Sequence, residues 1–249
     1  MNEKTYRHGH FVWRELMTTD LAKAKAFYSG LFGWTLADMP FSDGAYTLIS
    51  NGEKQIGGMM SVPEGAPPVS FWHSYASVAS VDAAVSATKE AGGNVLVGPI
   101  DAPNVGRFAV LMDPTGAVFS VITQENGDGE ACMPPAGAFC WESLNTSDAG
   151  AMLPFYEKAV GWAHKDHNGM SLLFAGENMV ADVGSPPPGV PSHWITHIVV
   201  ENLERSRDLS VSLGGQVMMG EVPVPGIGRL AVIQDPAGAT LSLFESAQR

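Results

Sequence analysis

The chain has 249 residues, of which 45% are hydrophobic and 16% charged, so it can bury a core without disulfides or a structural metal. Its 26 acidic and 14 basic residues give a formal net charge of −12, which opposes nucleic-acid phosphates and anionic lipid surfaces as partners. The sequence begins without the apolar run of a secretion signal and contains no 18-residue apolar stretch. We therefore expect a cytoplasmic protein that binds neither nucleic acid nor membrane. Its two cysteines, Cys132 and Cys140, predict free thiols.

The chain contains an internal repeat. Residues 13–34 (WRELMTTDLAKAKAFYSGLFGW) and residues 141–162 (WESLNTSDAGAMLPFYEKAVGW) share Trp, Leu, Thr, Asp, Phe-Tyr and Gly-Trp in the same order. Residues 106–117 and 228–239 share a Gly-Arg start and an Asp-Pro-x-Gly end. The repeat predicts a first module over residues 10–124 and a second over residues 137–246. A Gly-, Pro- and acid-rich linker at 125–136 joins them.

In the first module, each predicted helix is followed by strands. Thr19 or Asp20 can cap a helix that Gly33 ends, and Ser80 can cap a second helix that ends at residues 92–93. The Asp-Pro-Thr-Gly sequence at residues 113–116 predicts a type I turn between two strands of a hairpin. Alternating or continuous apolar patterns predict strands over residues 11–17, 45–50, 55–61, 69–77, 106–113 and 117–123.

The second module repeats this order. Pro154 falls in the second turn of the third predicted helix, where we expect it to bend the helix rather than break it. Asn202 is placed to cap the fourth helix, and Gly214-Gly215 to end it. The sequence therefore predicts four βαβββ units.

This fourfold layout, with its Thr-x-Asp-helix-Phe-Tyr and Gly-Trp starts and Gly-Arg…Asp-Pro-x-Gly ends, resembles the vicinal oxygen chelate superfamily. That superfamily includes glyoxalase I, bleomycin-resistance proteins, extradiol dioxygenases and fosfomycin-resistance enzymes. More narrowly, the chain looks like the two-module glyoxalase-like proteins of the hydroxylase-homologue and secreted-antigen type. The resemblance implies an α+β fold of two glyoxalase-like modules. Each would form an open, cup-shaped mixed sheet, with its helices outside and a ligand on the concave face.

Enzymes of this superfamily hold a divalent metal through a His on the first strand, a His on the strand that opens the second unit and a Glu on the last strand. Carried over to this chain, the first-strand positions fall on Trp13 and Trp141, whose indole groups can only donate hydrogen bonds. The last-strand positions, counted from the Asp-Pro-x-Gly turns, fall on Ser120 and Ser242.

The middle position of the resemblance falls on His73 in the first module and on Ile195 in the second. A further acidic ligand sometimes comes from the fourth strand, near Met59 in the first module and at Asp182 in the second, with the register uncertain by one residue. One ligand of three is kept in the first module and none in the second. We therefore expect no family-type metal site and no cofactor.

Residues present in both modules are expected to serve the shared fold, and polar residues present in only one are expected to serve a site. The arginines at strand starts are expected to pair with carboxylates. Trp13 and Trp141 are exceptions, because an inward-facing indole could stack on a planar ligand. The other twins are Phe27/Phe155, Tyr28/Tyr156, Trp34/Trp162, Arg107/Arg229 and Asp113/Asp235.

The polar residues that occur in one module only are Glu15, His73, Tyr75, Asn145 and His197. Strand parity groups Glu15 with His73 and Tyr75 in one cup, and Asn145 with His197 in the other, joined by Asp182 if its register places it on the same face. If repeats pair across the modules, Glu15 instead lies near His197. The sequence leaves both arrangements open.

Two functions follow. The first is binding of a small, partly apolar or aromatic molecule without a metal, with Trp13, Tyr75, Trp141, Asn145 and His197 as ligand contacts. The second is a metal-dependent enzyme of glyoxalase, dioxygenase or lyase type, with Glu15 and His73 as catalytic residues. There Glu15, His73 and His197 would be displaced ligands for one divalent ion such as Zn, Ni, Mn or Fe. The only expected partner is a small molecule, and the protein is expected to be a monomer or a homodimer.

Overall fold

The computed structural model of the protein describes residues 4–41, 44–130, 133–167 and 169–247. Cys132 lies outside the described residues. Cys140 is half-buried, and its Sγ donates to the carbonyl oxygen of His197 over 3.4 Å. Within the described ranges, no helix is both long and apolar enough to cross a membrane.

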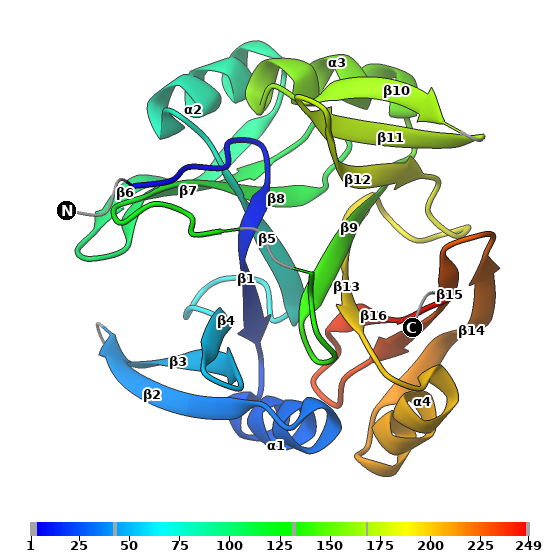
Figure 1. Ribbon diagram of the computed structural model, residues 1–249. Helices are drawn as coiled ribbons and strands as arrows, with labels where there is room; N and C mark the ends of the chain where they lie inside the picture. Colours follow the sequence, from blue (N-terminus) through cyan, green and yellow to red (C-terminus); the bar gives the residue numbers. More distant parts are fainter. Residues whose placement is uncertain (1–3, 42–43, 131–132, 168, 248–249) are drawn as a thin grey trace. The chain divides into compact units, whose positions relative to one another are not determined.

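Four βαβββ repeats follow one another along the chain, as the sequence predicts (Figure 1). Repeat 1 consists of β1 (Phe11–Thr18), α1 (Leu21–Phe32), β2 (Thr35–Phe41), β3 (Gly44–Asn51) and β4 (Lys54–Ser61). Repeat 2 consists of β5 (Phe71–Ser77), α2 (Val81–Glu90), β6 (Asn94–Ala102), β7 (Gly106–Met112) and β8 (Val118–Gln124).

The second half of the chain has the same order. Repeat 3 consists of β9 (Phe139–Asn145), α3 (Ala149–Ala159), β10 (Ala163–His167), β11 (Met170–Ala175) and β12 (Asn178–Gly184). Repeat 4 consists of β13 (His193–Val199), α4 (Leu203–Ser212), β14 (Gln216–Val224), β15 (Gly228–Gln234) and β16 (Thr240–Ser246).

Local capping signals determine where the helices begin and end. Asp20, rather than Thr19, caps α1, because its side chain accepts the Lys23 amide hydrogen bond. Gly33 ends that helix in the left-handed conformation with φ 69°. The predicted caps of α2 and α4, Ser80 and Asn202, are confirmed in the same way. Pro154 lies inside α3, which continues past it.

The sequence pattern does not predict where the second strand of each repeat begins and ends. β10 is exposed along its whole length, and β14 is exposed at most positions. Because an exposed strand does not need alternating apolar residues, these segments carry no period-two signal.

The strands form two mixed eight-stranded sheets, in the orders β2-β3-β4-β1-β5-β8-β7-β6 and β10-β11-β12-β9-β13-β16-β15-β14. By packing, however, the chain divides into two compact units. Unit 1 contains residues 1–13, 73–132 and 142–194, and unit 2 contains residues 14–72, 133–141 and 195–249. Unit 1 therefore combines repeats 2 and 3, and unit 2 combines repeats 1 and 4. The module boundaries read from the sequence remain a prediction.

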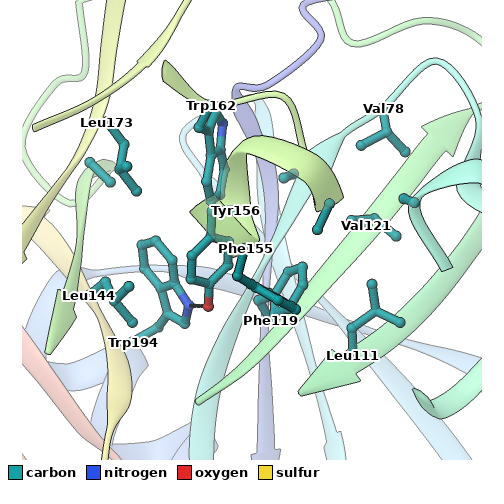
Figure 2. Close-up of a cluster of buried hydrophobic side chains, with 14 of the residues drawn as sticks. Val78, Leu111, Phe119, Val121, Leu144, Phe155, Tyr156, Trp162, Leu173 and Trp194 are labelled. Carbon is teal, nitrogen blue, oxygen red and sulfur yellow. Dashed lines mark hydrogen bonds between the residues drawn. The ribbon is translucent and has the colours of Figure 1, made fainter. Parts of the chain in front are cut away.

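Each unit has its own aromatic core. In unit 1 the rings of Tyr156, Trp162 and Trp194 pack with Phe119 and Phe155, as Figure 2 shows. The corresponding core of unit 2 contains Phe27, Tyr28, Trp34 and Trp72. The prediction that the Phe-Tyr and Gly-Trp twins are structural is confirmed, because all of these side chains are buried.

A chain of buried hydrogen bonds lies at the centre of each core. In unit 2, Trp72 Nε1 donates to Tyr28 Oη over 2.8 Å, and Tyr28 Oη donates to Asp235 Oδ2 over 3.0 Å. The other carboxylate oxygen of Asp235 accepts the amides of Ala237 and Ala239. The turn that carries Asp235 belongs to the second module, and the helix that carries Tyr28 to the first. These bonds therefore hold the two modules together within one unit.

Unit 1 contains the reciprocal chain. Trp194 Nε1 donates to Tyr156 Oη over 2.8 Å, and Tyr156 Oη donates to Asp113 Oδ2 over 3.0 Å. Burial raises the pKa of Tyr28 and of Tyr156 well above the ordinary value, so both remain protonated donors.

Tyr28→Phe is expected to lower the free energy of unfolding by about 1–3 kcal/mol, because it leaves a buried indole N–H and a buried carboxylate oxygen without their partner. Urea denaturation measures the change. Tyr6→Phe is the matched control, because Tyr6 is 37% exposed and the loss of its hydroxyl should change stability by less than about 0.5 kcal/mol. Equal effects of the two substitutions would contradict the role given to the buried chain.

Burial raises the pKa of Asp235 above its ordinary value of 3.8, so folding favours the protonated carboxyl. The stability that protonated Asp235 provides is complete below pH 3.8 and is lost as the pH rises through the raised folded-state pKa. Asp235→Asn cannot titrate. The unfolding free energy of wild type relative to this variant should therefore fall across that pH range. Urea midpoints measured on both sides of pH 3.8 test this, and a constant difference between the two proteins would refute it.

Candidate functional site

The four strands of one repeat make up half of an eight-stranded sheet. One face of each such half-sheet packs on the helix of its repeat, and the other face is turned away from that helix. In repeat 2, Ala109, Leu111, Phe119 and Val121 belong to the core that contains α2. Because side chains alternate along a strand, the side chains between them point to the opposite face. We call this opposite surface the repeat-2 face. Its residues are His73, Tyr75, Phe108, Val110, Met112, Ser120 and Ile122.

The polar part of the repeat-2 face is a histidine–serine pair. His73 Nδ1 lies 2.9 Å from Ser120 Oγ, within hydrogen-bonding distance, and both side chains are buried. The ring of Tyr75, the register partner of Ser120, lies 5.1 Å from that of His73 and 6.0 Å from that of Phe108. The structure therefore brings together two predicted site residues, His73 and Tyr75.

The rest of the repeat-2 face is apolar and partly accessible. Phe108 and Val110 are half-buried, and their register partners on β6, Ile100 and Val97, are 42% and 43% exposed. Accessible apolar side chains beside a buried polar pair are typical of a small-molecule site.

Repeat 4 carries the matching surface on the side of its sheet away from α4. Leu241 and Leu243 lie in the helix-side core, so Ser242 between them points to the other face. His197 on β13 is the register partner of Ser242, and Ile195 occupies the place of His73. We call this surface the repeat-4 face. Its residues are Ile195, His197, Met219, Leu230, Val232, Ser242 and Phe244.

Repeat 1 positions Glu15 beside a glycine. The Glu15 carboxyl group is buried in β1, and Gly58 on β4 is its register partner. A Cβ added to Gly58 would overlap with the hydroxyl of Tyr46, so the missing side chain admits the Tyr46 phenol. Tyr46 was not among the predicted site residues. The signal that could have found it is the Gly57-Gly58 pair inside a strand, since a strand glycine often marks a close approach.

Repeat 3 places its carboxylate on the other strand of the same pair. Ser143 on β9 is the register partner of Asp182 on β12, and its Oγ donates to Asp182 Oδ1 over 2.6 Å. Asp182 thus corresponds to Gly58, which corrects the alignment of Asp182 with Met59 by one residue. The Met59 side chain is fully buried in the helix-side core instead. Asn145, a predicted ligand contact, is half-buried at the end of β9.

The remaining predicted residues are distributed between the units. Glu15, Trp141 and His197 belong to unit 2, whereas His73, Tyr75 and Asn145 belong to unit 1. Trp13 and Trp141 are half-buried in β1 and β9. Their contact with a ligand stays a prediction.

The donor groups do not match the metal set of the superfamily named above. Ser120 hydrogen-bonds to His73 from the position where those enzymes carry a glutamate, and a hydroxyl is a poor substitute for a charged carboxylate ligand. Across the described part of the chain, no group of three or more His, Cys, Asp or Glu side chains is arranged to hold a metal ion. The residues present therefore do not fit that metal.

The twin arginines have the structural role that the sequence predicts. Arg107 forms ion pairs with Asp82 and Asp101, and Arg229 forms ion pairs with Glu221 and Glu245. The Arg107 cluster borders an open groove of about 540 Å³ at the start of α2. Because its guanidinium is already shared by two carboxylates, it has little capacity to bind an anionic ligand.

Gly58→Ala is expected to lower the unfolding free energy by about 1–3 kcal/mol, because the new methyl group overlaps with Tyr46. In a Tyr46→Leu background the same substitution should cost less, and the difference measures the coupling. Gly220→Ala is the control, since a Cβ at this strand glycine would meet nothing within 4 Å. Urea denaturation of the four variants checks the expectation, which fails if the cost of Gly58→Ala is the same in both backgrounds.

Comparisons with known proteins identify the family of this chain. The family model described as "Glyoxalase/Bleomycin resistance protein/Dioxygenase superfamily" matches residues 7–121. A Mycobacterium tuberculosis protein named "Putative glyoxylase CFP32" is 33% identical over 254 residues, which cover 97% of this chain and 97% of that protein. The anthracycline biosynthesis protein DauV of Streptomyces sp. strain C5 is 30% identical, with 94% and 92% covered.

A solved structure also resembles the chain. The Mn(II)-bound glyoxalase from Novosphingobium aromaticivorans matches with a TM-score of 0.66 at 15% identity, over 96% of this chain and 82% of that chain. At this identity the likeness shows a common fold only.

Proposed function

The chain belongs to the glyoxalase/bleomycin resistance protein/dioxygenase superfamily, and on this premise we propose that it binds a small, partly apolar or aromatic molecule without the metal used by enzymes of that superfamily. The observation that carries the proposal is the composition of the repeat-2 face. There the buried His73–Ser120 pair and the Tyr75 ring adjoin accessible apolar side chains. Such a face offers hydrogen-bonding groups for orientation and a ring for stacking.

The chemistry of the face favours an uncharged ligand. Phe108, Val110 and Met112 supply apolar contact, and the polar groups beside them are an imidazole, a hydroxyl and a phenol. No lysine or arginine occurs among the residues that define the repeat-2 face, and the net charge of −12 disfavours anions further.

Metal-dependent catalysis is the second candidate, and the relative named as a glyoxylase favours it. In that case Glu15, His73 and His197 would be the displaced ligands, and a carboxylate would transfer the proton at the substrate. We rank it second because Ser120 and Ser242 stand where a carboxylate ligand is needed.

Binding can be followed at the methyl group of Met112, which lies on the repeat-2 face. In the full chain labelled with methyl-¹³C methionine, ethylbenzene should shift the Met112 signal in a saturable way. Phe108→Ala should weaken this binding by about 2- to 12-fold, the value of an aromatic pair of 0.5–1.5 kcal/mol. Phe174→Ala, on repeat 3, is the matched control and should leave it unchanged. An unchanged affinity in Phe108→Ala would remove the repeat-2 face from the proposal.

Trp13→Phe tests the predicted aromatic wall of the first module in the same titration. Trp141→Phe tests that of the second module, with the methionine methyl groups of that module as reporters and circular dichroism to confirm folding. Weaker binding in either variant is expected, and unchanged binding in both would remove the stacking role.

Metal analysis of the purified protein separates the two candidate functions. We expect less than one equivalent of Zn, Ni, Mn and Fe together per chain, because the inherited donor positions hold indole and hydroxyl groups. Element analysis after gel filtration measures the content. One tightly held ion per chain that is lost in Glu15→Ala or in His73→Ala would overturn the first candidate in favour of the metal-dependent one.

A further inference from the structure

The twin serines of the two modules differ in their partners. Ser120 and Ser242 occupy matching positions on β8 and β16, and both side chains are fully buried. Ser120 hydrogen-bonds to His73, but the second module has Ile195 at the place of that histidine. The fold has therefore kept the serine in repeat 4 without the imidazole that its twin uses.

Among the residues that the structure describes, none hydrogen-bonds to the hydroxyl of Ser242. Buried polar groups are nearly always hydrogen-bonded, because a buried hydroxyl without a partner loses its interaction with water and gains nothing in return. An unsatisfied hydroxyl of this kind needs an explanation. One explanation is that an atom of a ligand supplies the missing hydrogen-bond partner, and the surroundings of Ser242 support it.

The surroundings of Ser242 are apolar and adaptable. His197 and Val232 flank it on the neighbouring strands, and Phe244 lies two residues along on the same face. Met219, the register partner of Val232, is 40% exposed, and its flexible thioether can repack around different shapes. Arg229 and its carboxylate partners Glu221 and Glu245 have the opposite strand parity, so the repeat-4 face carries no fixed charge from them.

We propose that the repeat-4 face is a second ligand site, which takes a neutral carbonyl compound with an apolar body and anchors its oxygen on the Ser242 hydroxyl. Ser242 Oγ donates to the carbonyl oxygen, and Leu230, Val232 and Met219 contact the body. Because Ser242 is fully buried, the ligand reaches its hydroxyl only when neighbouring side chains of the repeat-4 face move aside. This inference rests on the proposed function, which makes such a face a binding surface for small molecules. It adds the position of a second site and the carbonyl group that is bound there.

Two probes of similar shape test the anchor. Acetophenone carries a carbonyl oxygen that ethylbenzene lacks, and each is titrated into the full chain labelled with methyl-¹³C methionine. The Met219 methyl reports the repeat-4 face, the Met112 methyl reports the repeat-2 face, and Met→Leu variants assign the two signals. Because the probes differ in hydrophobicity, the measured quantity is the ratio of their dissociation constants. At Met219, the dissociation constant of acetophenone divided by that of ethylbenzene should be about two- to tenfold higher in Ser242→Ala than in wild type, the effect of one lost hydrogen bond. Ser120→Ala is the matched control and should leave the ratio at Met219 unchanged.

The outcomes separate this inference from the proposed function. The same ratio in wild type and Ser242→Ala overturns the anchor. Shifts at Met112 with none at Met219 overturn the second site and leave the proposed function standing. If neither methyl responds to either probe, both proposals fail. A changed ratio at Met219 alone supports the second site and moves the binding function to repeat 4.

Stability without a ligand gives an independent reading. Removing a hydroxyl that has no partner should leave the melting temperature of Ser242→Ala unchanged or raised. Ser120→Ala should lower it, because His73 loses its partner. A clear fall for Ser242→Ala would show that the hydroxyl is already satisfied in the free protein, and would overturn the inference.

Discussion

The hydrogen-bond chain from a strand tryptophan through a helix tyrosine to a turn aspartate is the interaction on which the rest of this structure depends. It occurs twice, as Trp72–Tyr28–Asp235 and Trp194–Tyr156–Asp113. In both, the tyrosine and the aspartate come from different modules. Buried groups of this kind must pair completely or the core is penalised, so each chain selects one partner repeat. This explains why the compact units join repeats 1 and 4, and repeats 2 and 3, rather than the halves of one module.

This constraint also separates structure from function within each sheet. The helix-side faces carry the aromatic cores and the paired groups, and these are nearly the same in both modules. The opposite faces do not contribute to those cores and have diverged. One carboxylate is kept on each first half-sheet, but it comes from β1 as Glu15 in the first module and from β12 as Asp182 in the second. Of the two matching strand positions in repeats 2 and 4, each repeat has a histidine at one, as His73 on β5 and as His197 on β13.

This divergence supports ligand binding without the superfamily metal. Metal coordination needs several charged or imidazole donors at fixed positions, and the serines at the last-strand positions cannot replace a carboxylate. A hydroxyl and an imidazole are sufficient to orient a neutral molecule on an apolar face. A fold shared with a glyoxalase does not by itself decide the chemistry, because one fold supports many activities.

The sequence by itself determined the four βαβββ repeats, the helix ends and the buried twins, because helix caps, Gly turns and apolar periodicity act over a few residues. It also identified Glu15, His73 and His197 as residues of one module only. The tertiary structure alone decided that Asp182 matches Gly58, that Tyr46 lies over that glycine, and that Tyr28 finds Asp235 across the chain. Strand register and long-range partners depend on packing between segments far apart in sequence, which a local pattern does not specify. The Gly57-Gly58 pair indicates a close approach, for example, but does not say which residue approaches.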